Sequence, residues 1–255
     1  MKKFALMLVF TLMATIAVAA QEKKADAPKP DAKPDVALPS VDEILTKFVK
    51  ATGGKEALEK LNSRVVKGSF EIEAMGVSGG FQSYAKAPNK NAVIVDVPGF
   101  GTVQNVFDGT TAWESNPQAG LRELTGAELA AQKRDHDFYQ PLHLKNHYPK
   151  MVVKGTEKVG SAVAVVVEAT PAEGGPEKFY FDVDSGLLLR QDAERETAQG
   201  KMAVEVYFED YKEVDGVKVA HTLKQVTPMF AMTIKMTDVK HNVPVEDSKF
   251  GKPAN

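Results

Sequence analysis

The sequence predicts a mainly β fold, an unclosed antiparallel barrel of about eleven strands with a helical lid at the N-terminal end of the domain. From Asn62 onward, apolar and polar residues alternate through many short segments, which is the period of half-buried strands. Gly, Pro, Asn and Asp separate these segments at hairpin spacing. So many consecutive strands must curl, because a flat sheet of this size would leave an apolar face and two long edges exposed.

The first forty residues are predicted to lie outside this fold. Residues 1–20 have a basic start, an apolar run and small residues up to Ala20, which predicts a cleaved secretory signal peptide. The alternative, an uncleaved anchor, is disfavoured because the apolar run is short for a span of about 20 residues. Residues 21–40 are rich in Pro, Ala, Lys and Asp and are predicted to be a disordered linker. We therefore expect a periplasmic protein with one folded domain at 41–255.

The composition limits the function classes. The chain has no Cys, so a secreted domain of this kind must depend on its core rather than on disulfides. Its formal charge is −2, and loss of Lys2 and Lys3 with the leader makes it −4. That balance gives no reason to expect nucleic acid as a partner. We expect a monomer.

Two short helices are predicted at the start of the domain. Ser40 and Glu43 have the spacing of a capping box, and Ile44 and Phe48 follow at helical spacing until a glycine pair. Residues 55–61 form the second helix, and together the two helices make the predicted lid.

The remaining elements are strands, interrupted by a single helix. Asp108-Gly109 is a strong hairpin signal. Thr125 and Glu128 suggest a second capping box, which opens a helix at 127–134. The predicted strands are at 65–74, 81–86, 91–97, 102–107, 111–115, 150–159, 162–171, 177–184, 186–196, 201–214, 217–226 and 229–241.

The alternation predicts which residues share a face. In 201–214, Met202, Val204 and Val206 oppose charged residues, so one face meets solvent and the other meets apolar atoms. The barrel interior is either a filled core or an apolar cavity, and the sequence leaves both open. The inward face is also open, because a register slip of one residue reverses it.

Four ordered segments resemble a known family. They are KAPNK at 86–90, VFDGTTAWESNP at 106–117, EKFYFDVDSGLLLR with ETAQGK at 177–201, and YKEVDGVKVAHTLKQ at 211–225. Over 41–253 the chain resembles the periplasmic lipoprotein-sorting family (LolA/LolB-like), and in particular a branch also found fused to insulinase-type zinc proteases. The resemblance implies an unclosed barrel around an apolar cavity, which takes lipid or lipoprotein acyl chains without catalysis. A protein-interaction or sensor module of the cell envelope with the same fold is the alternative.

The predicted ligand pocket consists of apolar residues on inward strand faces and on the lid. Methionine suits this place because it repacks easily around variable apolar partners, although it also fills ordinary cores. The predicted pocket residues are Ile44, Phe48, Phe70, Ile72, Phe107, Trp113, Phe230, Met232, Ile234 and Met236.

An enzyme is the third hypothesis, and it depends on two histidines. His143 and His147 have the i,i+4 spacing that on a helix can hold a metal, as in a metal hydrolase. The segment lacks the glutamate of an HExxH motif, and Pro141 and Pro149 predict an irregular segment or one short turn. No GxSxG motif is present either. We therefore expect no catalytic residue, metal or cofactor.

Overall fold

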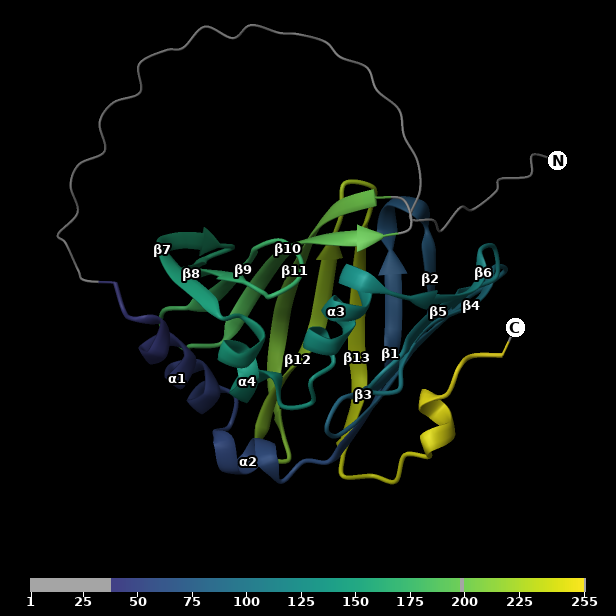
Figure 1. The fold of residues 1–255 in the computed structure, drawn as a ribbon, viewed down its shortest axis with the longest axis horizontal. Coiled ribbons are helices and arrows are strands. Elements are labelled where there is room, and N and C mark those ends of the chain that lie inside the picture. Colours follow the sequence, from purple (N-terminus) through teal and green to yellow (C-terminus); the bar gives the residue numbers. More distant parts are fainter. Residues whose placement is uncertain (1–37, 198–199, 255) are drawn as a thin grey trace, which may run out of the picture.

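The computed structural model describes residues 38–197 and 200–254, which form one sheet of thirteen antiparallel strands with helices on one face (Figure 1). The strand order is β6-β5-β4-β3-β2-β1-β13-β12-β11-β10-β9-β8-β7, so β6 and β7 are the two edges. The predicted unclosed antiparallel sheet is confirmed, with thirteen strands rather than about eleven. The predicted signal peptide and nearly all of the predicted linker lie outside the described residues.

The elements have the following bounds. The helices are α1 Val41–Ala51, α2 Lys55–Glu59, α3 Gly126–Asp135 and α4 Gln140–His147, with short 3-10 turns η1 Glu73–Met75 and η2 Asp247–Phe250. The strands are β1 Ser63–Ile72, β2 Val77–Lys86, β3 Lys90–Val97, β4 Gly101–Phe107, β5 Ala112–Asn116, β6 Gly120–Leu124, β7 Lys150–Val159, β8 Ala162–Thr170, β9 Glu177–Asp182, β10 Leu188–Thr197, β11 Gly200–Val214, β12 Val217–Val226 and β13 Ala231–His241.

The predicted capping boxes have opposite outcomes. At α1 the Ser40 hydroxyl accepts from the Glu43 amide at 3.3 Å, and the Ser40 amide donates to the Glu43 carboxylate at 2.8 Å, which confirms the box. At α3 the box is wrong, because the Thr125 side chain makes no capping hydrogen bond and Glu128 turns to Arg122 instead. A partner elsewhere in the fold has overridden the local signal.

Two elements differ from the sequence prediction. Residues 140–147 form the eight-residue helix α4 rather than an irregular segment, because Pro141 lies in the first helical turn, where a missing amide costs nothing. β6 was also missed, since its five residues include two charges and show little apolar alternation. Together α3 and α4 form the segment that connects the two edges of the sheet, β6 and β7 (Figure 1).

The strand register settles which face is covered by helices. Cross-strand partners point to the same side of a sheet. One row of partners runs Val153, Val167, Phe179, Gln191, Val206, Gln225 and Met232 across seven strands. Val167 and Phe179 pack beneath α1 and α4, so the whole row belongs to the helix-covered side, called the inner face below.

The inner face is densely packed at the β7–β10 end. Residues of α1 and α4 meet those strands in the largest core cluster, where Phe48 lies 5.1 Å from Phe181 between ring centroids. On the outer face, the C-terminal segment covers β3 and β4, with Phe250 buried against Ala92 and Val106.

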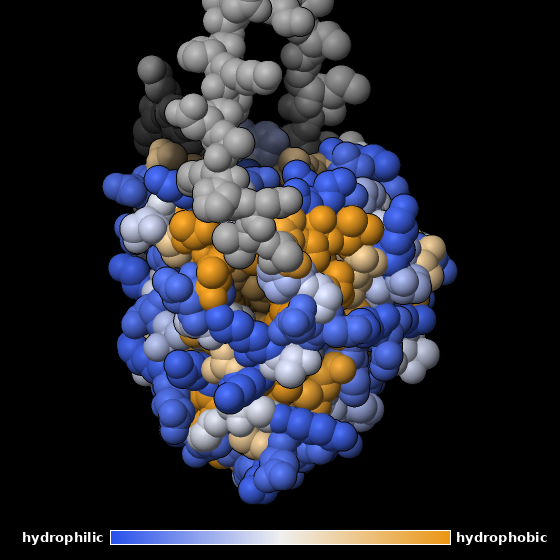
Figure 2. All heavy atoms as spheres, turned by 90° about the vertical axis from the view of Figure 1, so that its left-hand side faces the viewer, coloured by the Kyte–Doolittle hydropathy of each residue, from blue (hydrophilic) through white to orange (hydrophobic). Residues whose placement is uncertain are grey.

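The surface on the α1 and β7 side is mainly polar. Figure 2 shows two apolar areas there, separated by a polar band. Val152 of β7 and Val163 of β8 are 43% and 44% exposed. Within 38–197 and 200–254, no helix has the length and apolar character needed to cross a membrane.

Candidate functional site

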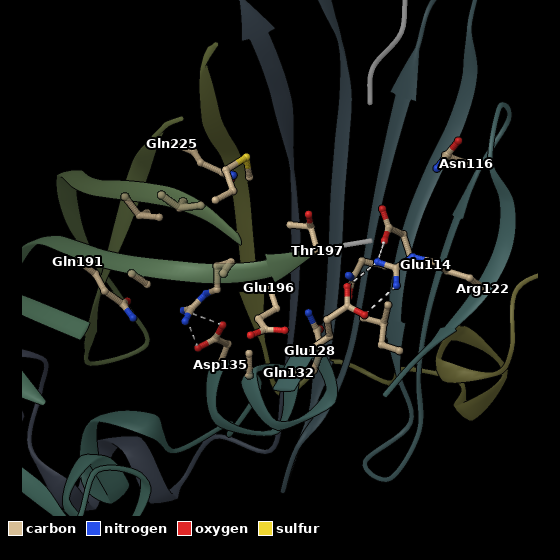
Figure 3. A pocket seen from close by; sticks show the side chains of 18 of the residues that line it. Glu114, Asn116, Arg122, Glu128, Gln132, Asp135, Gln191, Glu196, Thr197 and Gln225 are labelled. Carbon is tan, nitrogen blue, oxygen red and sulfur yellow. Dashed lines mark hydrogen bonds and ion pairs between the residues drawn. The ribbon is translucent and has the colours of Figure 1, made fainter. Parts of the chain in front are cut away.

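A cavity of about 550 Å³ lies on the inner face, beside the part that α1 and α4 cover. Its walls come from β4–β6 on one side, β10–β12 on the other, and α3 (Figure 3). The volume is within the range of small-molecule sites, roughly 300–1,000 Å³. The inner face is therefore neither wholly filled nor wholly hollow.

One wall of the cavity is apolar. It is built mainly from alternate residues of β11, namely Met202, Val204, Val206 and Phe208. This is the face that the alternation of 201–214 predicts to meet apolar atoms. Ala193 of the neighbouring β10 extends the wall, because it pairs with Val204.

The opposite wall is charged and centres on Arg122 of β6. Its guanidinium donates to Glu114 of β5 at 2.7 Å and to both carboxylate oxygens of Glu128 at 2.8 Å. These bonds, chiefly those with Glu128, raise the pKa of Arg122 although partial burial opposes its charge. Two strands and a helix are thus tied together by one side chain.

Asn105 of β4 lies beside this group, because it is the cross-strand partner of Glu114. Its Oδ1 atom is buried and has no hydrogen-bond partner among the described residues. Other atoms of Asn105 line the cavity, whereas Oδ1 itself is closed off from it.

A buried charge network closes the cavity between α3 and the β9–β10 hairpin. Glu177 is 1% exposed and accepts from Arg195 at 2.6 Å and from Arg134 at 3.2 Å. The Tyr148 hydroxyl donates to the same carboxylate at 2.9 Å, and Gln191 donates at 2.7 Å. The network therefore anchors α3 and the start of β7 to β9 and β10.

The network shifts the pKa values of Glu177 and Asp135 in opposite directions. Burial opposes the charge of Glu177, but Arg195 and Arg134 outweigh it and the pKa of Glu177 is lowered. Burial dominates at Asp135 and raises its pKa, although Arg195 lies 3.1 Å away. Arg195 therefore contacts both carboxyls, but the pKa of Glu177 is lowered while that of Asp135 is raised.

The predicted pocket residues do not line this cavity. Ile44 and Phe48 belong to the packed cluster under α1, and Phe107 is fully buried with Ala112 and Leu124. A separate cluster on β1–β4 and β13 contains Phe70, Ile72, Phe230, Met232 and Ile234.

Two further predicted residues have distinct places. Met236 pairs with Gly68 and lies on the inner face of β13, half-buried. Trp113 lies on the outer face of β5, where it packs against the cluster of Ala92, Val106 and Phe250. Alternation along β5 places Trp113 opposite to Glu114, so it is turned away from the cavity.

The cavity residues Glu114, Arg122 and Glu128 were missed from the sequence. The predicted pocket consisted of apolar residues alone, whereas polar side chains of two strands and a helix line this cavity. One signal was available, because Glu114 and Arg122 are cross-strand partners in a hairpin, with opposite charges on one face.

The histidine pair of α4 has a carboxylate between its rings. Asp137 Oδ2 lies 2.7 Å from His143 Nδ1 and 2.7 Å from His147 Nε2. The described residues contain no group of three His, Cys, Asp or Glu side chains placed to hold a metal ion.

Comparison with known proteins shows which solved structures share this fold. No protein-family model matches the sequence, and no curated protein matches it. Among solved structures, a DUF1329 family protein from Desulfovibrio piger has a TM-score of 0.57 at 15% identity, covering 83% of this chain and 97% of that one.

Two further structures extend this likeness. An outer membrane lipoprotein-sorting protein domain from Vibrio parahaemolyticus has a TM-score of 0.56 at 13% identity, covering 82% of this chain and 95% of its own. A LolA superfamily protein from Nitrosomonas europaea has a TM-score of 0.56 at 11% identity, covering 84% and 99%. In all three cases, the similarity covers at least 95% of the other protein's chain.

Proposed function

This chain has the fold of the LolA-superfamily structures. On that premise, we propose that it is a non-catalytic carrier or receptor of the cell envelope that binds a ligand with an apolar chain. Lipids and lipoprotein acyl chains are the proposed ligand class. The envelope location is part of the proposal, since it rests on the leader at residues 1–20 and on the lipoprotein-sorting role named for the Vibrio parahaemolyticus domain.

The observation that carries the proposal is the cavity along β11. Its apolar wall offers Met202, Val204, Val206 and Phe208 to a ligand. Burial of a methylene group contributes about 0.8 kcal/mol, so a ten-carbon chain gains on the order of 8 kcal/mol in a dry site. That gain is large enough to keep an acyl chain bound in an aqueous compartment.

The predicted apolar residues of β13 extend this proposal. Met232 is the cross-strand partner of Gln225, which lines the cavity. A chain longer than the cavity would therefore continue along the inner face toward Met232 and Ile234, where methionine can adjust to different chains.

A second candidate function, a protein-interaction module, rests on the turns at one end of the barrel. Met75 in η1 and Met229 before β13 are 41% and 49% exposed. Exposed methionines of this kind suit a partner surface. Recovery of one specific envelope protein by the ligand-free chain would favour this function over the carrier.

Native mass spectrometry of the chain from Gln21 onward, isolated from the periplasm, tests the carrier. We expect a bound mass that organic extraction resolves to a lipid or an acylated peptide. Val206→Glu should remove it, and Val206→Trp should also weaken binding by filling the cavity without adding a charge. Ala203→Glu is the matched control, because Ala203 is exposed on the other face of β11.

The result that overturns the carrier is a bare protein that stays bare after incubation with ten-carbon amphiphiles. Equal binding by the Val206 variants and the Ala203 variant would also overturn it. Melting temperatures of all variants separate loss of binding from loss of folding.

A further inference from the structure

One wall of the cavity is apolar and the other is charged. The charged wall therefore indicates the chemistry of the ligand's polar end, as the apolar wall indicates its chain. An apolar chain fits along β11, which leaves the other end of the ligand facing β4–β6 and α3 (Figure 3). The following inference rests on the proposed function, because it specifies the head group of the same ligand.

The cavity lining as a whole holds more acid than base. Two arginines and four carboxylates line the cavity, namely Arg122, Arg195, Glu114, Glu128, Asp135 and Glu196. Behind them, the buried Glu177 is matched by Arg134, so the excess stays negative. Two arginines against the three other carboxylates still leave a negative excess, so the sign does not depend on the charge of Asp135.

Both arginines of the lining are already engaged. Arg122 is held by Glu114 and Glu128, and Arg195 Nη1 lies 2.6 Å from Glu177 while its Nη2 lies 3.1 Å from Asp135. An anionic head group would have to displace one of these carboxylates or lie next to it unpaired. Both alternatives oppose phosphate and carboxylate heads.

Carboxylates are the charged groups of this wall that a ligand would meet next to Arg122. Glu114 has its Oε2 atom on Arg122, and Glu128 faces it from α3. A protonated ligand amine beside Glu114 and Glu128 would donate to these carboxylates and offset the negative excess.

We propose that the ligand is an amphiphile with a cationic amine head, held at Glu114 and Glu128, and an apolar chain along β11. Charge and hydrogen bonding select the head, while the chain supplies most of the affinity. An amine lipid head group and the free amine of an acylated peptide share this chemistry.

Competition among three ten-carbon probes tests the proposal. Decylamine, decanol and decanoate carry a positive, a neutral and a negative head at pH 7, because an alkyl amine titrates at about 10.4 and a carboxylic acid at about 4. Displacement of N-phenyl-1-naphthylamine reports their affinities. We expect decylamine to bind at least about tenfold more tightly than decanoate, with decanol between them.

The variant pair Glu114→Gln with Glu128→Gln should abolish or reverse this order, because it leaves Arg122 without a charged partner. Glu123→Gln is the matched control, since Glu123 is exposed on the other face of the same strand as Arg122. Should the double variant fail to fold, wild-type protein in rising salt gives a second readout. There the preference for decylamine should shrink as the charges are screened.

Each outcome decides between the two proposals. Equal binding of the three probes, or a preference for decanoate, overturns the amine head and leaves the carrier standing. Binding of none of them overturns the carrier itself. Where decylamine is preferred, competition between a long-chain amino alcohol and an acylated peptide with a free amine separates a lipid source of the amine from a peptide source.

Discussion

The two halves of the inner face carry similar sequence patterns but are covered differently. At the β8–β9 end, Val167 and Phe179 are 0% and 1% exposed, because α1 and α4 press against them. On β11, Val206 and Phe208 stay partly exposed and line the cavity. We call these the filled half and the hollow half.

The difference teaches that alternation fixes the orientation of a side chain but not what it meets. Both halves present β-branched and aromatic residues to the same side of one sheet. In the filled half, the amphipathic helix α1 packs directly against the strands. In the hollow half, the cavity and its charged side chains lie between α3 and β11. Helix placement, rather than strand sequence, divides core from cavity.

The largest effect is expected at the charge network on the border of the two halves. Glu177→Gln removes the charge that pairs with Arg134 and Arg195, and breaking a buried pair in this way costs about 3 kcal/mol of unfolding free energy. Denaturant unfolding measures the loss. An unchanged unfolding free energy would contradict the view that this network anchors α3.

The same variant should also change the acid sensitivity. The pKa of Glu177 is lower in the folded chain than in the unfolded chain, so its contribution is present above about pH 4.3 and is lost as pH falls through the folded value. Wild type should therefore lose more stability than Glu177→Gln between about pH 5 and pH 3. His136, whose pKa burial lowers to about 4, contributes equally to both proteins.

A matched pair of valines compares the halves directly. Val167→Ala opens a space in the filled half and should cost about 2 kcal/mol, whereas Val206→Ala only enlarges the cavity and should cost less than about 0.5 kcal/mol. For a chain of this size that is a melting-temperature gap of about 3–6 °C. Equal losses would show that the hollow half is packed in solution.

The smallest effect concerns the starts of the two covering helices. Ser40→Ala should destabilise α1 by about 1 kcal/mol, because the hydroxyl caps the helix. Thr125→Ala should cost clearly less, since its side chain makes no capping bond at α3. Thermal unfolding of the two variants measures the difference, and similar losses would mean that Thr125 caps α3 after all.

Much of the sheet could be predicted because its signals are local. Gly and Asp mark the hairpins, and the alternation in β1 and β13 placed Phe70 and Ile234 on one face, as their pairing confirms. The helix α4 was hidden by Pro141, whose effect depends on its position in the first turn. β6 was hidden by its charges, which find partners only when β5 and α3 are in place.

The cavity could not be predicted in the same way. Glu114 and Arg122 have the composition of a solvent-facing strand, and only the tertiary fold turns that face inward. The apolar residues that were chosen instead, such as Phe70 and Met232, pack with one another in a separate cluster. Hydrophobicity marks the inner face as a whole, whereas the empty space depends on the gap beneath one helix.

The pairing of β1 with β13 has a consequence for how the chain reaches this structure. Every other neighbouring pair in the sheet is consecutive in sequence, so β1–β6 and β7–β12 are two meanders that can assemble from local contacts. Only β13 joins them, since it pairs with β12 on one side and with β1 on the other. We therefore expect a growing chain to form two separate ribbons until its final strand is made, and a chain that ends before Ala231 to lack the strand that joins them.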